Sequence, residues 1–248
     1  IQLIDTEGNV FAEITDYVLK KVNRINALFE ESSESLYQLK WMAQEAFEEE
    51  KTEVTGPILL FKDNMEIYKS ILEQLKIHDD DVIEVEFGDE FQKINGRKFL
   101  ISGSEEDYVQ LLHSINDQNI SSIIHMSSIS RQGTESLTDL EDMQNKGVYS
   151  LFRLVRGLSK NKMKSNINLH LISDLVTEVS GEENTINPLG AALFGLGRVI
   201  SQEFQNVSCK AIDIDEHTSP EIISEELRTK GKHYQVAFRD GKRYISRL

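Results

Sequence analysis

Three stretches decide the fold of this chain: residues 167–172 (INLHLI), 187–204 (NPLGAALFGLGRVISQEF) and 207–214 (VSCKAIDI). The first and third are short apolar runs, as expected of strands that are buried on both faces of a sheet. The middle stretch carries apolar residues at helical spacing. A strand, a helix and a strand in this order predict a parallel sheet with helices packed on its faces.

The same alternation of strands and helices runs back towards residue 56. Further strands are predicted at residues 58–61, 82–87 and 122–126. Helices are predicted behind the capping candidates Asp63 and Asn64, behind Ser104, over residues 140–158, and behind Ser219-Pro220. Hairpins are predicted at residues 91–101, around Asn95-Gly96, and at 234–248, around Asp240-Gly241. The predicted fold is α/β, with a Rossmann-like, doubly wound and mainly parallel sheet.

The N-terminal part of the chain has a different pattern. Residues 1–26 alternate between apolar and polar side chains around the turn 5–9, which predicts a β-hairpin followed by a short strand or helix at 17–22. The polar stretch 30–35 (EESSES) is typical of a linker. We therefore divide the chain into an N-terminal β extension at residues 1–30 and a main domain at residues 36–248.

Composition excludes several classes of protein. The 248 residues have a formal net charge of −15, which disfavours binding to nucleic acid. The apolar runs are too short to cross a membrane, and the single cysteine, Cys209, excludes a disulfide framework. Without a signal peptide the chain is expected to be cytoplasmic, and the missing initiator methionine indicates a piece of a larger protein.

The glycine-rich turn that binds dinucleotides is missing where a Rossmann fold would carry it. Glycines are needed after the first strand because the backbone must approach the pyrophosphate at a helix N-terminus. Here the strand at 58–61 runs into Lys62-Asp63-Asn64-Met65, which has no glycine and contains a carboxylate. We therefore expect this chain to bind no dinucleotide, and we assign it no cofactor-binding residue.

A second glycine-bearing segment lies at residues 190–198 and contains Gly195-x-Gly197. It falls within a predicted helix rather than before one, and glycine inside a helix costs roughly 1 kcal/mol relative to alanine. We expect Gly190, Gly195 and Gly197 to permit close packing against a neighbouring element. Contact with a ligand is the alternative.

Tyrosine and histidine patterns predict no catalytic or metal site. Tyr17 and Lys21 have the Tyr-x-x-x-Lys spacing of short-chain reductases, but they precede the whole sheet. The six histidines include no His-x-x-x-His pair of the kind that binds zinc. His125, at the end of an apolar run, is expected to be a hydrogen-bonded core residue.

Polar residues also follow two of the predicted strands. Ser127 and Ser128 lack the Gly-x-Ser-x-Gly surroundings of a nucleophile elbow. Asp213 and Asp215 are expected to be solvated at the end of their strand, with a cation site as the alternative. We assign the chain no catalytic and no metal-binding residue.

Four stretches in order along residues 36–248 resemble the structural half of the ketoreductases of modular polyketide synthases. They are 36–41 (LYQLKW), 123–128 (IIHMSS), 187–203 with 211–215 (AIDID), and 235–248, which begins QVAFRDGKRY. Residues 1–23 resemble the last strands of a dehydratase domain.

The resemblance implies a non-catalytic, truncated Rossmann subdomain that braces an NADPH-binding catalytic subdomain during polyketide antibiotic biosynthesis. NADPH would bind only to that partner, and the dehydratase and an acyl carrier protein would be neighbours in the same multifunctional enzyme. The surface towards the catalytic subdomain is predicted to include Leu36, Tyr37, Trp41, Tyr234, Val236, Tyr244 and Leu248. The alternatives are an inactive pseudo-ketoreductase spacer and a stand-alone nucleotide-binding enzyme of Rossmann-like fold.

Overall fold

The computed structural model describes residues 39–44, 50–63, 65–129, 136–160 and 166–247, together with the backbone of two strands nearer the N-terminus. The chain divides into two compact units, Ile1–Gln38 and Leu39–Leu248. In the first unit β1 (Gln2–Ile4) pairs antiparallel with β2 (Val10–Glu13), which confirms the predicted hairpin. The element predicted at 17–22 and the linker at 30–35 lie outside the described residues.

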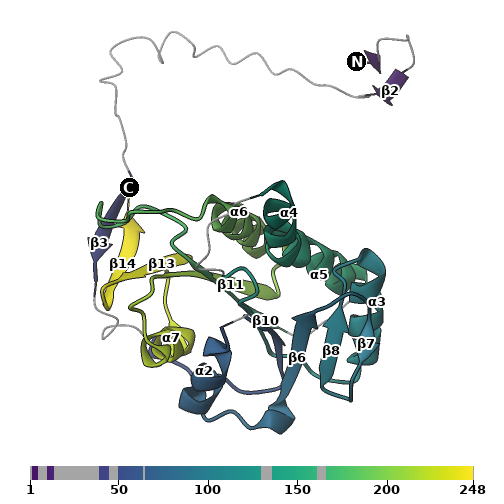
Figure 1. The fold of residues 1–248 in the computed structure, drawn as a ribbon, viewed down its shortest axis with the longest axis horizontal. Coiled ribbons are helices and arrows are strands. Elements are labelled where there is room, and N and C mark those ends of the chain that lie inside the picture. The colour runs from purple at the N-terminus through teal and green to yellow at the C-terminus, as the bar shows by residue number, and fades with distance from the viewer. Residues whose placement is uncertain are drawn as a thin grey trace. The chain divides into compact units, whose positions relative to one another are not determined.

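The second unit is built on a ten-stranded sheet in the order β3-β14-β13-β11-β10-β9-β5-β6-β8-β7 (Figure 1). From β13 to β8 neighbouring strands are parallel, and β14, β3 and β7 join antiparallel at the two edges. This confirms the mainly parallel, doubly wound fold. The strands are β3 (Lys40–Ala43), β5 (Ile58–Phe61), β6 (Val82–Phe87), β7 (Gln92–Lys93), β8 (Lys98–Ile101), β9 (Ser122–His125), β10 (Ile167–Asp174), β11 (Val207–Ile214), β13 (Gln235–Arg239) and β14 (Lys242–Arg247). The short strands β4 (Glu50–Lys51) and β12 (Thr229–Lys230) form a separate pair.

Helices cover both faces of this sheet, which is why its central strands carry apolar core residues on both faces. On one face α3 (Glu105–Ser114), α5 (Val148–Lys160) and α6 (Pro188–Glu203) pack over a core that includes Leu59 and Phe61. On the other face α2 (Ile67–Leu75) and α7 (Pro220–Arg228) pack over Ile58 and Leu60 (Figure 1). The remaining helices are the 3₁₀ turn η2 (Asp79–Asp81) and α4 (Leu137–Lys146).

Helix starts follow the predicted caps, but one predicted helix is wrong in length. The hydroxyls of Ser104 and Ser219 accept the backbone N–H groups of Asp107 and Ile222, as expected of N-caps. The pattern over 140–158 forms two helices instead of one. Gly147 leaves helical geometry at φ −95° and ψ −106°, and its N–H closes the last turn of α4.

The three glycines of α6 do not share one role. A methyl group on Gly190 would lie 2.5 Å from Val176 Cγ2, and one on Gly197 would lie 2.7 Å from the Tyr234 hydroxyl oxygen. These two glycines therefore permit close packing, as predicted. Gly195 has nothing within 4 Å of that position and faces outward, so the packing role predicted for it is wrong.

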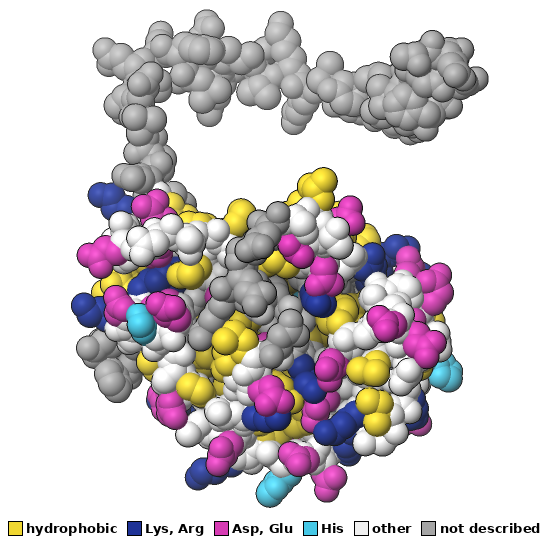
Figure 2. Space-filling view, viewed as in Figure 1, with side chains coloured by type: hydrophobic (Ala, Val, Ile, Leu, Met, Phe, Trp, Pro, Cys, Tyr) yellow, Lys and Arg dark blue, Asp and Glu magenta, His cyan; other side chains and the backbone are white. Residues whose placement is uncertain are grey.

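Charge is spread over the surface of the second unit. Figure 2 shows acidic and basic side chains interspersed on one face of the described residues. No helix among the described residues is long and apolar enough to cross a membrane.

Candidate functional site

A doubly wound sheet binds its ligands at the carboxyl ends of its strands, where the strand order changes direction. In this chain the change occurs at β5. The next strand in sequence, β6, lies on one side of β5, and β9 lies on the other. The turn from β5 into α2 and the carboxyl end of β9 therefore occupy the position where a dinucleotide would be expected.

The turn from β5 into α2 is filled by the chain's own carboxylate. Asp63 is 4% exposed. Its Oδ2 accepts the N–H groups of Met65 at 2.9 Å and Ile67 at 3.0 Å, and its Oδ1 accepts that of Tyr68 at 3.1 Å. N–H groups at a helix N-terminus are the donors that a bound phosphate would use. A phosphate would have to displace Asp63 and overcome its negative charge.

The capping role predicted for Asp63 is thereby confirmed, although the helix begins four residues later. Glu66 occupies the N-cap position with φ 58°, and its side chain accepts no hydrogen bond from the helix. The Asp63 carboxylate accepts these hydrogen bonds in its place. The second candidate, Asn64, lies outside the described residues.

The cation beside this turn is also neutralised from within the chain. Lys62 Nζ lies 2.9 Å from Glu86 Oε2 and 3.4 Å from Glu84 Oε2, both on β6. Burial opposes the charged form, but the hydrogen bonds to Glu86 and Tyr68 outweigh it and raise the pKa of Lys62. Lys62 is therefore held as a cation against its own carboxylates rather than presented to a ligand.

At the end of β9, His125 is a core residue, as predicted. The ring is fully buried, stacks on Phe61 with 5.1 Å between ring centroids, and places Nε2 2.9 Å from Ser150 Oγ. The Tyr108 hydroxyl donates to the same oxygen at 2.7 Å. Burial lowers the pKa of His125 to about 3, so the ring is neutral at physiological pH.

The hydroxyls that follow His125 are engaged by backbone carbonyls. Ser127 Oγ donates to Lys146 O at 2.7 Å, and Ser128 Oγ donates to Ile172 O at 3.3 Å. Among the described residues, neither side chain is paired with a base. The described helices contain no tyrosine followed four residues later by lysine, and Tyr17 lies outside the described residues.

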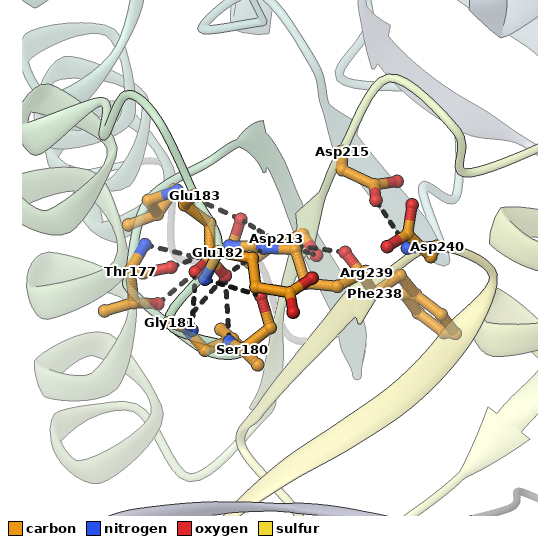
Figure 3. Close-up of polar contacts among 12 residues, drawn as sticks. Thr177, Ser180, Gly181, Glu182, Glu183, Asp213, Asp215, Phe238, Arg239 and Asp240 are labelled. Atoms are coloured by element: carbon orange, nitrogen blue, oxygen red, sulfur yellow. Dashed lines mark hydrogen bonds and ion pairs between the residues drawn. The ribbon is translucent and has the colours of Figure 1, made fainter.

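A buried ionic cluster closes the carboxyl ends of β10, β11 and β13 (Figure 3). Arg239, at the end of β13, is 4% exposed. Its guanidinium binds both carboxylate oxygens of Asp213, at 3.2 and 3.1 Å, and Nε binds Glu183 Oε1 at 2.8 Å. Nη2 also donates to Thr177 O at 2.7 Å. One side chain therefore ties β13 to β11 and to the segment between β10 and α6.

That segment, residues 175–187, is fixed further by the two carboxylates. Asp213 accepts the N–H groups of Val176 and Thr177, each at 3.0 Å. Glu183 accepts those of Val179, Ser180 and Gly181 at 2.9 to 3.0 Å. Although burial opposes ionisation of Glu183, these N–H groups and Arg239 lower its pKa to about 2. The segment is held across the strand ends by charge-assisted hydrogen bonds.

The prediction that Asp213 and Asp215 are solvated is wrong. Asp213 is fully buried against Arg239, and Asp215 is 6% exposed and accepts the N–H groups of His217 and Asp240. Among the described residues, no group of three or more His, Cys, Asp or Glu side chains could hold a metal ion. Sequence reasoning missed Arg239 and Glu183, because no local pattern connects them with Asp213.

The described residues of the predicted partner surface fall into two groups. Trp41 and Tyr244 are half-buried on the adjacent strands β3 and β14. Val236 is fully buried in the core, and the Tyr234 hydroxyl donates to Phe194 O beneath the Arg198 guanidinium, so both serve this chain's own packing and we drop them from that surface. Leu36, Tyr37 and Leu248 lie outside the described residues.

Comparison with known proteins places this fold among synthase domains. The family model described as "Beta-ketoacyl synthase-like, N-terminal" matches residues 56–229. Polyketide synthase 37 of Dictyostelium discoideum is 30% identical over 106 residues, which are 40% of this chain and 4% of that protein.

Two solved structures share the fold at 20% identity. One is a keto acid-selecting NRPS module with adenylation, ketoreductase and pseudo Asub domains, with a TM-score of 0.74 over 85% of this chain and 18% of the other. The second is an N-terminal ketoreductase from the macrolactin assembly line, with a TM-score of 0.68 over 84% of this chain and 43% of the other. The chain thus spans less than half the length of these relatives.

Proposed function

Because the chain belongs to the β-ketoacyl synthase-like, N-terminal family and has the fold of synthase ketoreductases, we propose that it is a non-catalytic subdomain that braces a ketoreductase catalytic subdomain. The catalytic subdomain would bind NADPH and reduce the growing polyketide. A dehydratase domain and an acyl carrier protein would be its other neighbours in the same module.

The observation that carries this proposal is the occupation of the β5–α2 turn by Asp63. Three backbone N–H groups that would hold a pyrophosphate are satisfied internally by a side chain that is itself an anion. A further observation agrees with a bracing role. The Arg239 cluster ties down the segment over the strand ends, where a substrate would otherwise be held.

The partner surface that we propose lies on the β3–β14 edge of the sheet. Trp41 is opposite Ser246, and Ala43 is opposite Tyr244, so the two aromatic side chains lie on the same face of these strands. Leu39, two residues before Trp41, is 53% exposed, whereas Met42, 50% exposed, is paired with Ile245 and points to the other face. Half-exposed aromatic and apolar side chains on an edge strand are suited to docking against another domain.

Co-expression with a catalytic subdomain tests the proposal. Hydrogen exchange should slow at residues 40–43 and 242–247 when the two parts associate, and the complex should reduce a β-ketoacyl substrate with NADPH. Trp41→Ala should weaken association, because an aromatic anchor in an interface contributes about 2 kcal/mol or more. Phe152→Ala is the matched control, because Phe152 is a 48% exposed aromatic residue on α5, outside the predicted surface. If the two parts do not associate, or if hydrogen exchange slows at other residues instead, the alternative of an inactive pseudo-ketoreductase spacer is favoured.

A separate titration distinguishes the brace from a stand-alone enzyme. The chain alone should bind NADPH no more tightly than about 1 mM, the weak end of the affinity scale. Removing the carboxylate with Asp63→Ala frees the N–H groups at the start of α2 and should not lower the affinity for NADPH. A micromolar isotherm for the unaltered chain would contradict the bracing role and support a nucleotide-binding enzyme.

A further inference from the structure

The sheet face beneath α2 and α7 changes character along the three central strands. Near the carboxyl ends Ile124, Ile172 and Ile212 belong to the apolar core. Near the amino ends the same face carries polar side chains on every strand, because alternate and cross-strand positions share a face. We call this set the polar floor: Ser122 on β9, Asn168 and His170 on β10, and Ser208 and Lys210 on β11.

The polar floor departs from the usual composition of such a sheet. Central strands of a parallel sheet are normally apolar on both faces. Sequences tend to break a local rule of this kind at functional sites. All five residues of the floor line one cavity of about 460 Å³, within the range of small-molecule sites. Its walls are residues 52–54, Ser201 and Gln205 near the end of α6, and residues 229–234.

His170 gives this cavity a hydrogen-bonding group that the described residues do not satisfy. The side chain is 8% exposed, and its Nδ1 has no hydrogen-bond partner among the described residues. Burial, with the charge of Lys210 beside it, lowers the pKa of His170 to about 3, so the ring is neutral. A neutral imidazole has one donor and one acceptor nitrogen. Leaving this shielded nitrogen unpaired is unfavourable, and a ligand that reached it would relieve that cost.

Lysines outnumber acidic residues among the described residues that line the cavity. Lys210 is occupied by Glu226 Oε1 at 2.5 Å and Thr229 O at 2.7 Å, and Lys230 lies 3.6 Å from Glu50. Lys232 has no ion-pair partner among the described residues. Glu53 is the one acidic residue among the described residues that line the cavity. Because Lys210 and Lys230 are paired, Lys232 is the lysine of the described lining that is left to meet a ligand.

We propose that the cavity binds a small molecule carrying an oxyanion, either a phosphate or a carboxylate. Lys232 supplies the charge, and the hydroxyls of Ser122 and Ser208 with the His170 ring supply hydrogen bonds. Charge-assisted hydrogen bonds to an oxyanion are about twice as strong as neutral ones. The site lies at the amino ends of the strands and does not depend on the proposed bracing role.

Amide NMR titration of the full chain tests this site, with inorganic phosphate and acetate added separately at constant ionic strength. One anion or both should give saturable shifts at residues 122, 168, 208 and 231–233, with a Kd of about 1 mM or tighter. Saturation by phosphate alone would identify a phosphate ligand, and saturation by acetate a carboxylate ligand. Non-saturating shifts at these positions with both anions would overturn the proposal.

Variants separate a specific site from general attraction to surface lysines. Lys232→Ala should weaken binding by about tenfold or more, whereas Lys40→Ala, an exposed lysine on β3, should leave the Kd unchanged. His170→Gln should also weaken binding. If this substitution of a buried residue prevents folding, Lys232→Ala still tests the proposal, because Lys232 is exposed. Equal Kd values for Lys232→Ala and the unaltered chain would overturn the proposal.

Discussion

Gly197→Ala in α6 should destabilise the chain even though alanine is the better helix former. A methyl group at this position would overlap the Leu171 side chain and lie 2.7 Å from the Tyr234 hydroxyl oxygen and 3.0 Å from Cys209 Sγ. Leu171 is fully buried, and Tyr234 is anchored by its hydrogen bond to Phe194 O, so the surroundings have little room to adjust. Overpacking costs about 1–3 kcal/mol, against about 1 kcal/mol returned by helix propensity. We expect a net loss of up to about 2 kcal/mol.

Gly195→Ala is the matched control for this prediction. It lies two residues away in the same helix, with nothing within 4 Å of an added methyl group, so only the gain of about 0.5–1 kcal/mol from helix propensity remains. Thermal unfolding should lower the Tm of the first variant and raise that of the second, by about 2–4 °C per kcal/mol for a chain of this size. If both shifts have the same sign, α6 is not packed as described.

Two further predictions concern buried charge. The free energy of unfolding should fall by about 4 kcal/mol between pH 7 and pH 5, because His125 and His170, with pKa values lowered to about 3, take up protons only in the unfolded chain, where the pKa is near 6.5. Urea unfolding measures this loss, and His170→Gln should remove about half of it; an unchanged loss would contradict the assignment. Arg239→Ala should cost about 3–5 kcal/mol, since Asp213 and Glu183 would lose their buried cation. Arg239→Lys should restore little, because one ammonium cannot replace the paired bonds of a guanidinium, and equal stability of Arg239→Lys and the unaltered chain would refute this.

Several elements could be located from the sequence because their signals are local. The strands at 58–61, 82–87 and 207–214 have the predicted bounds, since each begins and ends with apolar residues that pack into the core. The turn between β13 and β14 could also be predicted from a local signal, the pair Asp240-Gly241. Asp240 and Gly241 both have positive φ, 48° and 72°, as a tight two-residue hairpin turn requires.

The absence of a glycine-rich dinucleotide-binding turn could also be predicted from the sequence, because such a turn depends on a few consecutive residues after β5. What the sequence could not give is the way in which Asp63 replaces a bound phosphate. Its carboxylate reaches N–H groups two to five residues ahead, and this depends on the path of the turn into α2. The sequence shows that an aspartate stands at position 63, but it does not show which N–H groups that aspartate binds.

Tertiary structure alone decided which polar groups are buried together and which glycines are in contact. Arg239 is 26 residues from Asp213 and 56 from Glu183, so no periodic pattern links them. Gly195 and Gly197 are alike in sequence but lie on opposite sides of one helix, one exposed and the other buried against β10 and β11. Periodicity reports burial within one element, whereas ion pairs, close approaches and cavities depend on which elements become neighbours.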